Sequence, residues 1–311
     1  MKKMFVMANW MQGTGLSGGD RIFIELVKRW QLKLNITLFL SKEGSAICRR
    51  HDLGKINQQI WASDFMSRWG YFVDILYRTI NSIIKVFSVK TASGDIIFSS
   101  SDFWPDSFPA LILKRRNPEI IWIAGFYLFA PKPWQKNSPY RGKNFLTGLL
   151  YWIGQLPTYY IIRRFADIVF VTSQPDVDQF TTNIRSKERV IVIRGGVDTV
   201  SAKHYLNSKN VIPPEKRTYD ACFAGRFHYQ KGVLELVKTW KSVCLKCPQA
   251  HLAMIGGGPL VREVKNLIEK LGLSKNIYLA GFLDGPKKFE IFKQSRLVVH
   301  PAIFDSGGMA A

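Results

Sequence analysis

The sequence predicts an α/β fold made of two Rossmann-like parallel-sheet domains. Short apolar runs rich in β-branched residues alternate with segments whose apolar residues recur at helical spacing. This alternation stops at a polar stretch and then starts again, and glycine-bearing turns repeatedly join an apolar run to the next helical segment. Strands that alternate with helices in this way form parallel sheets covered by helices. The length of 311 residues agrees, because it is about two domains' worth at roughly 100–200 residues each.

The first domain is expected over residues 1–200. Its start, MKKMFVMANW, has two lysines and an apolar run, but the run is too short for a secretory signal and leads straight into the glycine-rich loop QGTGLSGGD. We therefore predict a first strand over Met4–Asn9, followed by a helix that places Ile22, Ile24, Leu26, Val27 and Trp30 at helical spacing. Later strands are predicted at Ile36–Leu40, Asp95–Ser99, Ile120–Ile123, Asp167–Thr172 and Arg189–Ile193.

A linker is expected over residues 201–218, which are polar and contain Pro213 and Pro214. The second domain, residues 219–311, restarts the alternation. Its predicted strands are Asp220–Ala224, His251–Ile255, Asn276–Leu279 and Arg296–His300, and its predicted helices are Gly232–Cys244, Leu260–Leu271 and Lys287–Lys293. The series then stops, so we expect the second domain to be incomplete.

Two apolar stretches of the first domain allow two interpretations. Tyr71–Lys90 carries Phe72, Ile75, Leu76, Ile80, Ile83, Ile84 and Phe87 on one face, with Arg78 and Lys85 nearby. Phe145–Phe165 is more apolar and aromatic, is broken by Pro157 and ends in Arg163 and Arg164. Each stretch is either a basic, aromatic contact with a membrane surface or a helix that faces the core of the domain.

Charge and cysteine content narrow the class of protein. Lys and Arg total 44 against 23 Asp and Glu, a formal net charge of +21 that is spread along the chain. Such a surface favours phosphorylated substrates or an anionic membrane, and without a basic block or motif it does not predict nucleic-acid binding. No run of roughly 18 apolar residues predicts a membrane-spanning helix. Four cysteines are too few for a disulfide scaffold, so we expect a cytoplasmic protein, with peripheral membrane contact as the further interpretation.

Two cations stand in the first strand-to-helix turn of the second domain. Arg226 and Lys231 flank FHYQ, with Gly225 before and Gly232 after them. Two cations beside a helix N-terminus are suited to hold a diphosphate, because the helix dipole and its unpaired amides add to their charge. The simpler interpretation is a pair of solvated surface cations.

Other turns are weaker signals. The IGGGP turn, with Gly256 and Gly257, either lets a ligand approach the backbone or only makes a tight turn. The first loop superficially fits GxGxxG from Gly13, yet no acidic residue ends a clear second strand, so no NAD site is predicted. Asp305 in HPAIFDSGG is suited to accept hydrogen bonds from sugar hydroxyls, or it is a turn or helix-cap residue. The five histidines show no metal-ligand spacing.

Taken in order, AGRF-x3-KG, IGGGP, LAGF and HPAIFDSGG resemble the C-terminal half of the retaining glycosyltransferases of family 4, which carry the glycosyl transferases group 1 domain in a GT-B fold. The N-terminal half resembles the family less tightly, through SGGD, ADIVFVTSQ and VIVIRGGVD. Residues 32–165 are the least diagnostic part. The resemblance implies two Rossmann-like domains that face a cleft, and a donor site mostly on the second domain.

The resemblance also implies roles for single residues. Arg226 and Lys231 would hold the donor diphosphate and stabilise charge on the leaving group. Asp305 would lie near the donor sugar as the first acidic residue of the family's E-x7-E motif, and we expect it, with the two cations, to be catalytic. The remaining expected donor-binding residues are Gly18, Gly19, Gly256, Gly257, Gly281, Phe282, Leu283, Ser306, Gly307, Gly308 and Met309. Neither a protein nucleophile nor a metal or other cofactor is expected.

The sequence departs from the family pattern in three places. Asp305 stands where glutamate is usual, and the second acidic position of the motif would fall two places beyond Ala311. AGFYLFAPKPW lacks the histidine that the family often has after the strand at Ile120–Ile123. The expected function is transfer of a hexose-type sugar from a nucleoside-diphosphate sugar to a glycan or lipid-linked acceptor with retention, as in polysaccharide biosynthesis. We expect this length of chain, a fragment on this interpretation, to turn over poorly, and the alternative is a degenerate, non-catalytic nucleotide-sugar-binding or membrane-associated protein.

Overall fold

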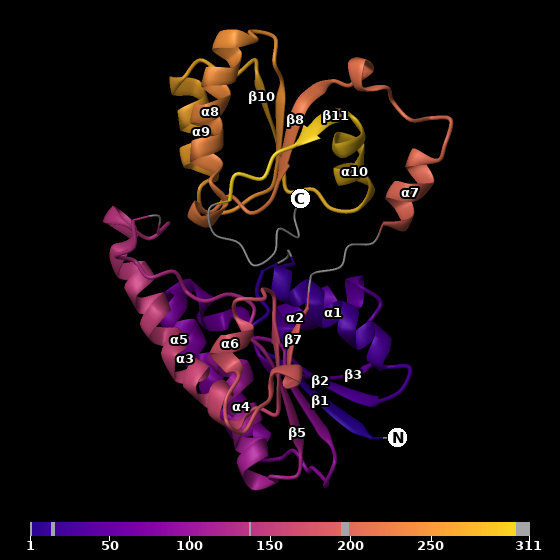
Figure 1. Cartoon of the computed structure of the whole chain (residues 1–311), viewed down its shortest axis with the longest axis vertical. Coiled ribbons are helices and arrows are strands. Elements are labelled where there is room, and N and C mark those ends of the chain that lie inside the picture. Colours follow the sequence, from indigo (N-terminus) through magenta and orange to yellow (C-terminus); the bar gives the residue numbers. More distant parts are fainter. Residues whose placement is uncertain (1, 14–15, 137, 194–198, 303–311) are drawn as a thin grey trace. The chain divides into compact units, whose positions relative to one another are not determined.

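A computed structural model describes residues 2–13, 16–136, 138–193 and 199–302 of the chain (Figure 1). The chain divides into two compact units. The first comprises Met1–Ala130 and Thr147–Gly196, and the second comprises Pro131–Leu146 and Val197–Ala311. The predicted boundaries at residues 200 and 218 stay predictions, although the predicted linker does contain a short helix, α7 (Val200–Leu206), and a 3-10 turn, η4 (Pro214–Lys216).

Among the described residues, the first unit is built on a seven-stranded sheet in which all neighbouring strands run parallel. Along the sheet the strands stand in the order β3-β2-β1-β4-β5-β6-β7. The strands are β1 (Lys3–Ala8), β2 (Asn35–Ser41), β3 (Asn57–Ala62), β4 (Ile96–Ser99), β5 (Ile121–Gly125), β6 (Ile168–Val171) and β7 (Val190–Val192). Strand β1 is almost wholly buried, because it lies in the middle of the sheet between β2 and β4.

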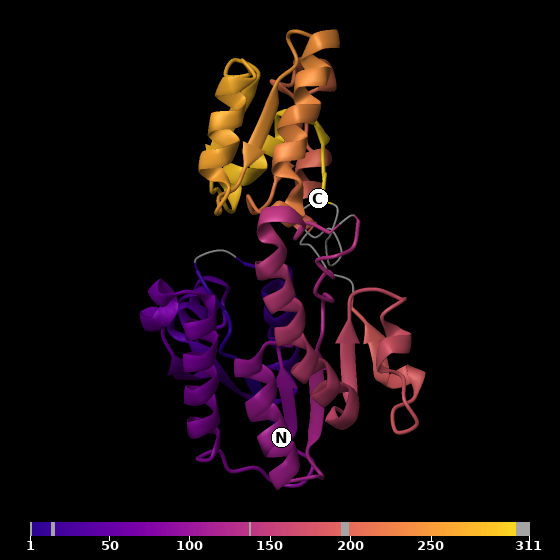
Figure 2. The same ribbon diagram turned by 90° about the vertical axis from the view of Figure 1, so that its left-hand side faces the viewer.

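Helices cover both faces of this sheet (Figure 1). Helices α1 (Gly18–Trp30) and α2 (Lys42–Arg50) lie on one face. Helices α3 (Tyr71–Val86), α4 (Trp104–Arg116) and α5 (Phe145–Phe165) form the layer on the other face, which Figure 2 turns toward the viewer. The shorter elements of this unit are η1 (Asp64–Trp69), α6 (Val177–Phe180) and η3 (Lys187–Arg189). A further short turn, η2 (Gly142–Asn144), belongs to the second unit. None of the described helices has the length and apolar character that a membrane crossing needs.

The burial of the side chains of α3 departs from the pattern that either interpretation of its sequence predicts. Arg78, expected beside a basic surface, is fully buried, and so are Asp74, Thr79 and Ser82 on the same side of the helix. Leu76, Ile80 and Ile84, which a core-facing helix would bury, are instead exposed. The helix therefore turns these polar side chains toward the unit, together with Ile75 and Val86, which are also buried. Helix α5 is mixed: Gln155, Thr158 and Ile162 are buried, whereas Ile153 and Tyr160 are exposed.

The second unit repeats the same construction on a smaller scale. In the part that the structure describes, its sheet has four parallel strands in the order β10-β9-β8-β11. The strands are β8 (Tyr219–Ala224), β9 (Leu252–Ile255), β10 (Ile277–Gly281) and β11 (Ser295–Val298), and the helices are α8 (Val233–Lys246), α9 (Val261–Lys270) and α10 (Pro286–Lys293). A short turn, η5 (Tyr229–Lys231), precedes α8. Helices α8 and α9 lie together on one face of the sheet, and α10 lies on the other (Figure 1).

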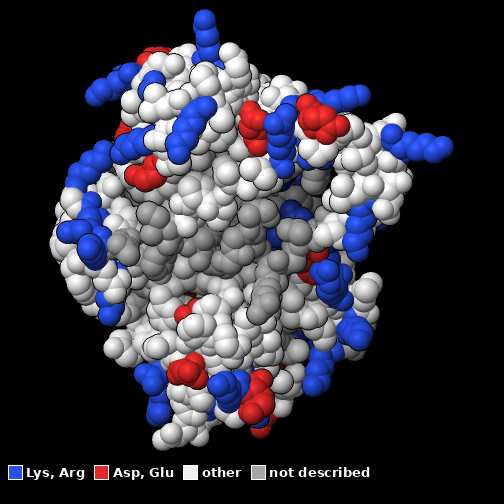
Figure 3. Space-filling view, turned by 45° about the horizontal axis from the view of Figure 1, so that its top comes forward, with Lys and Arg blue, Asp and Glu red and all other residues white. Residues whose placement is uncertain are grey.

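Charged side chains are scattered over the surface. On the face drawn in Figure 3, Lys and Arg side chains are spread around the molecule and outnumber Asp and Glu. This distribution matches the even spread of basic residues along the sequence. On this face, as along the sequence, the basic residues are spread out, so the net charge of +21 does not by itself indicate a site.

Candidate functional site

The order of strands in the second unit locates its binding crevice. Strand β8 has β9 on one side and β11 on the other, so the direction in which strands are added reverses between β8 and β11. Ligands of open α/β sheets bind outside the carboxyl ends of the strands at such a point. The described segments that leave β8 and β11 there are Gly225–Gly232 and Val299–Ala302. Arg226 and Lys231 lie on the first of these segments.

Backbone hydrogen bonds join three successive turns at this edge. The Gly225 amide donates to the Ile255 carbonyl (3.0 Å), the Phe227 amide to the Gly257 carbonyl (2.8 Å), and the Gly256 amide to the Gly281 carbonyl (2.8 Å). Gly256 has φ +146°, and a Cβ there would lie 1.9 Å from the Gly225 carbonyl oxygen. Only glycine allows this approach, so the turns after β8 and β9 are held together as one ledge.

Gly257 has a different surrounding. Its backbone has no positive φ, and a Cβ built on it would meet only Phe282 Cβ, at 4.0 Å. The sequence predicted both Gly256 and Gly257 as donor-binding. The structure distinguishes them, because Gly256 is required by the packing of the backbone whereas Gly257 borders open space.

The charges of Arg226 and Lys231 act on one side chain between them. His228 is half-buried, and burial, followed by repulsion from Arg226 and then from Lys231, lowers the pKa of His228 to about 4. The imidazole is therefore neutral at pH 7, and its Nδ1 accepts a hydrogen bond from the Gln230 amide (3.4 Å). Two cations that both act on one half-buried imidazole create a local positive potential, which is what an anion such as a diphosphate requires. The sequence shows that His228 stands between the two cations, but only the fold shows that it is half-buried.

Helix α8 begins beside these cations. Its N-cap, Gly232, has φ +63° and no side chain with which to cap the first-turn amides. A Cβ on Gly232 would lie 2.4 Å from the carbonyl oxygen of Pro301, so the chain that follows β11 passes directly over the start of α8. Asp305, Ser306, Gly307, Gly308 and Met309 lie outside the described residues. Their expected roles stay predictions.

The turn after β10 carries the remaining expected donor-binding residues of this unit. Gly281 has φ +70° and is exposed, and the Phe282 side chain is 56% exposed. Leu283 is half-buried. Phe282, whose Cβ lies near Gly257, has an exposed aromatic ring that is suited to stack on another flat ring. The expected role of these residues in donor binding stays a prediction.

Gly18 and Gly19 open helix α1 in the first unit. Ser17 and Asp20 form a capping box, in which Ser17 Oγ accepts from the Asp20 amide (3.2 Å) and Asp20 Oδ2 accepts from the Ser17 amide (2.9 Å). The first helical turn leaves the amides of Gly18 and Gly19 without helical acceptors. A Cβ on Gly19 would lie 2.9 Å from the Tyr127 ring, so this glycine also serves packing. An approach of the two glycines to a donor phosphate stays a prediction.

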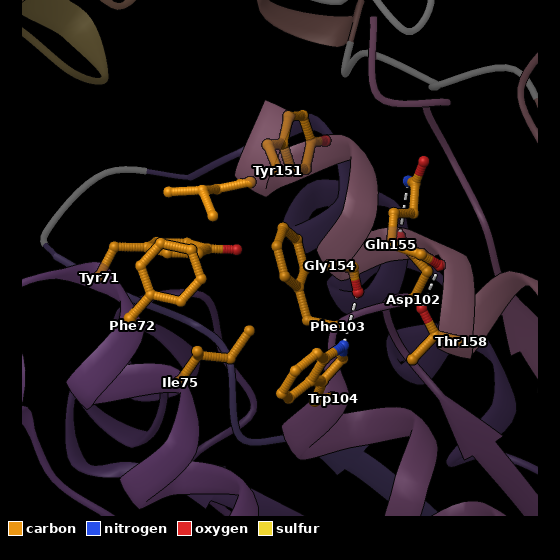
Figure 4. Close-up of a pocket in the computed structure, with 11 residues that line it drawn as sticks. Tyr71, Phe72, Ile75, Asp102, Phe103, Trp104, Tyr151, Gly154, Gln155 and Thr158 are labelled. Carbon is orange, nitrogen blue, oxygen red and sulfur yellow. Dashed lines mark hydrogen bonds between the residues drawn. The ribbon is translucent and has the colours of Figure 1, made fainter. Parts of the chain in front are cut away.

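The first unit also contains a pocket between α3, the end of β4 and α5 (Figure 4). Most of its wall is apolar, from Tyr71, Phe72 and Ile75 on one side to Phe103 and Trp104 on the other. Its polar side is a buried pair in which Gln155 Nε2 donates to Asp102 Oδ2 (2.8 Å), and burial raises the pKa of Asp102 to about 6. Sequence reasoning did not find this pocket, because its walls come from three separate segments.

Comparison with solved structures identifies the architecture as the GT-B fold. The structure of HepE from Anabaena in complex with UDP and glucose aligns with 98% of this chain and 75% of its own, with a TM-score of 0.62 and 15% identity. TarM of S. aureus, solved with Fondaparinux, alpha-GlcNAc-glycerol and UDP, aligns with 100% of this chain and 83% of its own, with a TM-score of 0.65 and 11% identity. At these identities the likeness establishes the fold, and the predicted fold class is confirmed.

Sequence comparison then relates the second unit to a family of known proteins. Residues 206–311 match the family described as glycosyl transferases group 1. An uncharacterized glycosyltransferase of Methanocaldococcus jannaschii is 27% identical over 235 residues, which cover 74% of this chain and 55% of that protein. The poly(glycerol-phosphate) alpha-glucosyltransferase of Bacillus subtilis is 25% identical over 46% of this chain and 20% of its own length. The chain therefore has glycosyltransferase homologues and spans about half their length or less.

Within the described ranges, no group of three or more His, Cys, Asp or Glu side chains is placed to hold a metal ion. The cations that act on His228 at the crevice of the second unit are Arg226 and Lys231. The expectation that no metal is used stays a prediction.

Proposed function

We propose that this chain carries the donor-binding half of a glycosyltransferase that moves a hexose-type sugar from a nucleoside-diphosphate sugar to a glycan or lipid-linked acceptor, with retention. The observation that carries the proposal is the placement of Arg226 and Lys231 on the turn after β8, at the reversal point of a sheet whose residues match a glycosyltransferase family. The bound UDP in the HepE and TarM structures supports a nucleoside-diphosphate donor. A cytoplasmic location beside the membrane belongs to the same proposal, and the low number of cysteines supports it.

In this proposal the two cations act mainly on the leaving group. Breaking the bond between sugar and phosphate leaves added negative charge on the nucleoside diphosphate. Arg226 and Lys231 already produce a positive potential at this edge, so they stabilise that charge without reorganising. The uncapped backbone amides at the start of α8 also stabilise this negative charge. Asp305 would lie near the donor sugar, with the amides of Ser306–Met309 behind it, as the family resemblance implies.

Equilibrium binding of UDP and GDP tests the donor site. We expect Arg226→Gln and Lys231→Gln each to weaken binding by about ten- to a hundredfold, because a charge-assisted hydrogen bond contributes roughly 1.5–3 kcal/mol. Lys246→Gln is the matched control, since this exposed lysine ends α8, at the opposite end from the site. If both site variants bind UDP and GDP as tightly as the control, the proposed donor site is wrong.

A second measurement separates an enzyme from the binding-protein alternative. A chain that is a transferase releases nucleoside diphosphate from its donor sugar when glycan or lipid-linked acceptors are supplied. Release that is lost in Arg226→Gln and retained in Lys246→Gln supports the enzyme. Tight donor binding without release, also in a version extended to the full length of its relatives, would establish the non-catalytic alternative.

A further inference from the structure

Helix α3 exposes a stripe of apolar side chains to solvent. Phe72, Leu76, Ile80 and Ile84 recur at intervals of four residues and form one stripe, and their exposed fractions range from 43% for Phe72 to 64% for Ile84. At 1.5 Å per residue the stripe is about 18 Å long. A surface helix of a water-soluble unit normally shows the reverse arrangement, with its apolar side toward the core. This stripe therefore needs an explanation.

The orientation of α3 is fixed by a buried arginine. The Arg78 guanidinium is fully buried and donates to both carboxylate oxygens of Asp74 (3.0 and 3.1 Å), to Glu43 Oε1 (3.0 Å) and to the Asn9 carbonyl (3.1 Å). Rotating the helix to bury its apolar stripe would break this network and leave a buried charge unpaired, which is strongly unfavourable. The exposed stripe is thus a fixed feature of the folded unit.

Aromatic and basic side chains extend the stripe at both ends. In η1, which packs against α3, Phe65 and Trp69 are 57% and 66% exposed, and the Arg68 guanidinium lies over both rings at 4.9 and 5.8 Å. Beyond the other end of the helix, Phe87 is 60% exposed and lies under the Arg116 guanidinium (5.8 Å). Exposed tryptophan and basic side chains beside an apolar stripe are the composition that favours the interface between lipid and water.

The described charged side chains of this surface are basic where they are exposed. Asp64 is the first residue of η1, and the one acidic residue of α3, Asp74, is buried and paired with Arg78. Over residues 65–90 the exposed charged residues are Arg68, Lys85 and Lys90. An occupant of this surface therefore combines an apolar layer with negative charge. A second copy of the chain does not meet this requirement, because a symmetric contact would bring the exposed cations of both copies together.

We propose that η1 and α3 form a surface that binds an anionic lipid bilayer, with α3 lying in the interface and its stripe in contact with the acyl chains. Apolar contact and attraction of the cations to anionic headgroups add in this arrangement. The Phe72 end of the stripe also lines the pocket between α3 and α5, so the bound surface leads into that pocket (Figure 4). The proposal specifies where a membrane-linked acceptor would be met, but it does not require transfer to occur.

Cosedimentation of the whole chain with vesicles tests the surface, using phosphatidylcholine alone and phosphatidylcholine with phosphatidylserine. The double variant Ile80→Gln/Ile84→Gln removes apolar contact without adding charge. Its control is Leu206→Gln/Leu245→Gln, which changes two leucines that are 63% and 74% exposed on α7 and α8. Exposed positions of this kind change stability by only about 0.5 kcal/mol, so both variants are expected to fold.

We expect wild type and control to bind the anionic vesicles alike and the isoleucine variant to bind at least about tenfold more weakly. Arg68→Gln/Lys85→Gln should lower binding to anionic vesicles and leave binding to neutral vesicles unchanged. Equal binding by the isoleucine variant and wild type overturns the proposal, and so does a wild-type dimer that the isoleucine variant dissociates. UDP binding, measured on the same samples, reports separately on the proposed donor site.

Discussion

Replacing Gly256 by alanine should destabilise the second unit strongly, and the structure gives the magnitude. The backbone at Gly256 has φ +146°, a conformation open essentially to glycine alone, and holding another residue there costs roughly 1–3 kcal/mol. The new Cβ would lie 1.9 Å from the Gly225 carbonyl oxygen, so the backbone must move by more than about 1 Å. That shift would break at least one hydrogen bond of the ledge, each contributing about 1 kcal/mol. The expected loss is about 3 kcal/mol.

Amide hydrogen exchange measures this loss of stability in each unit separately. A local measurement is needed because the two units need not unfold together. A loss of about 3 kcal/mol should speed amide exchange in β8 and β9 by roughly a hundredfold and leave β1 and β4 of the first unit unchanged. Gly257→Ala is the adjacent control and should leave exchange nearly unaltered, since its Cβ meets no atom closer than 4.0 Å. Equal exchange in the two variants would refute the assignment of Gly256 as the residue that holds the turns together.

Two further predictions concern charged groups. Arg78→Met should destabilise the first unit by about 3–5 kcal/mol in urea unfolding, because it leaves Asp74 buried without its partner, whereas Arg68→Met, at an exposed arginine, should change the stability by less than about 1 kcal/mol. Below pH 6.5 the His228 imidazole becomes protonated in the unfolded chain. In the folded chain its pKa is about 4, so it stays neutral until the pH approaches that value. The second unit should therefore lose stability as the pH falls from 6.5 to 4. His228→Gln should reduce this loss, and an NMR titration that finds an ordinary pKa for His228 would contradict the assignment.

Most strands could be predicted from sequence because they are buried in parallel sheets. Such strands carry continuous apolar runs, as in Met4–Asn9 and His251–Ile255, and the structure has β1 and β9 there. Strand β3 (Asn57–Ala62) escaped prediction because it is an edge strand whose first four residues, NQQI, are mostly exposed. A polar, exposed edge leaves no apolar run in the sequence.

The orientation of α3 could not be predicted from its own residues. The periodicity predicted one apolar face, but the structure divides it, because Ile75 is buried whereas Leu76, Ile80 and Ile84 are exposed. This orientation depends on Arg78 and on partners distant in sequence, since Glu43 is 35 residues away and the Asn9 carbonyl 69. Pairing over such distances is a property of the folded chain, so the sequence left the two interpretations open.

For the site, sequence order predicted which turns meet but not what each residue does there. Glycine in the IGGGP turn indicated a tight turn or a ligand contact, and the structure assigns the first role to Gly256 and leaves space at Gly257. His228 carried no signal as a metal ligand. Its surroundings became informative only when the fold placed a half-buried imidazole within the field of two cations.

The neutral state of His228 follows from the same charges that would bind a diphosphate. In the folded chain Nδ1 accepts from the Gln230 amide, so the imidazole hydrogen is on Nε2 and the ring presents a donor. A bound diphosphate would offset the charges of Arg226 and Lys231, which are two of the three causes of the low pKa. Binding should therefore raise the pKa of His228 above 4 and, by linkage, make donor binding stronger as the pH falls. The histidine thus reports on occupancy of the very position that the two cations define.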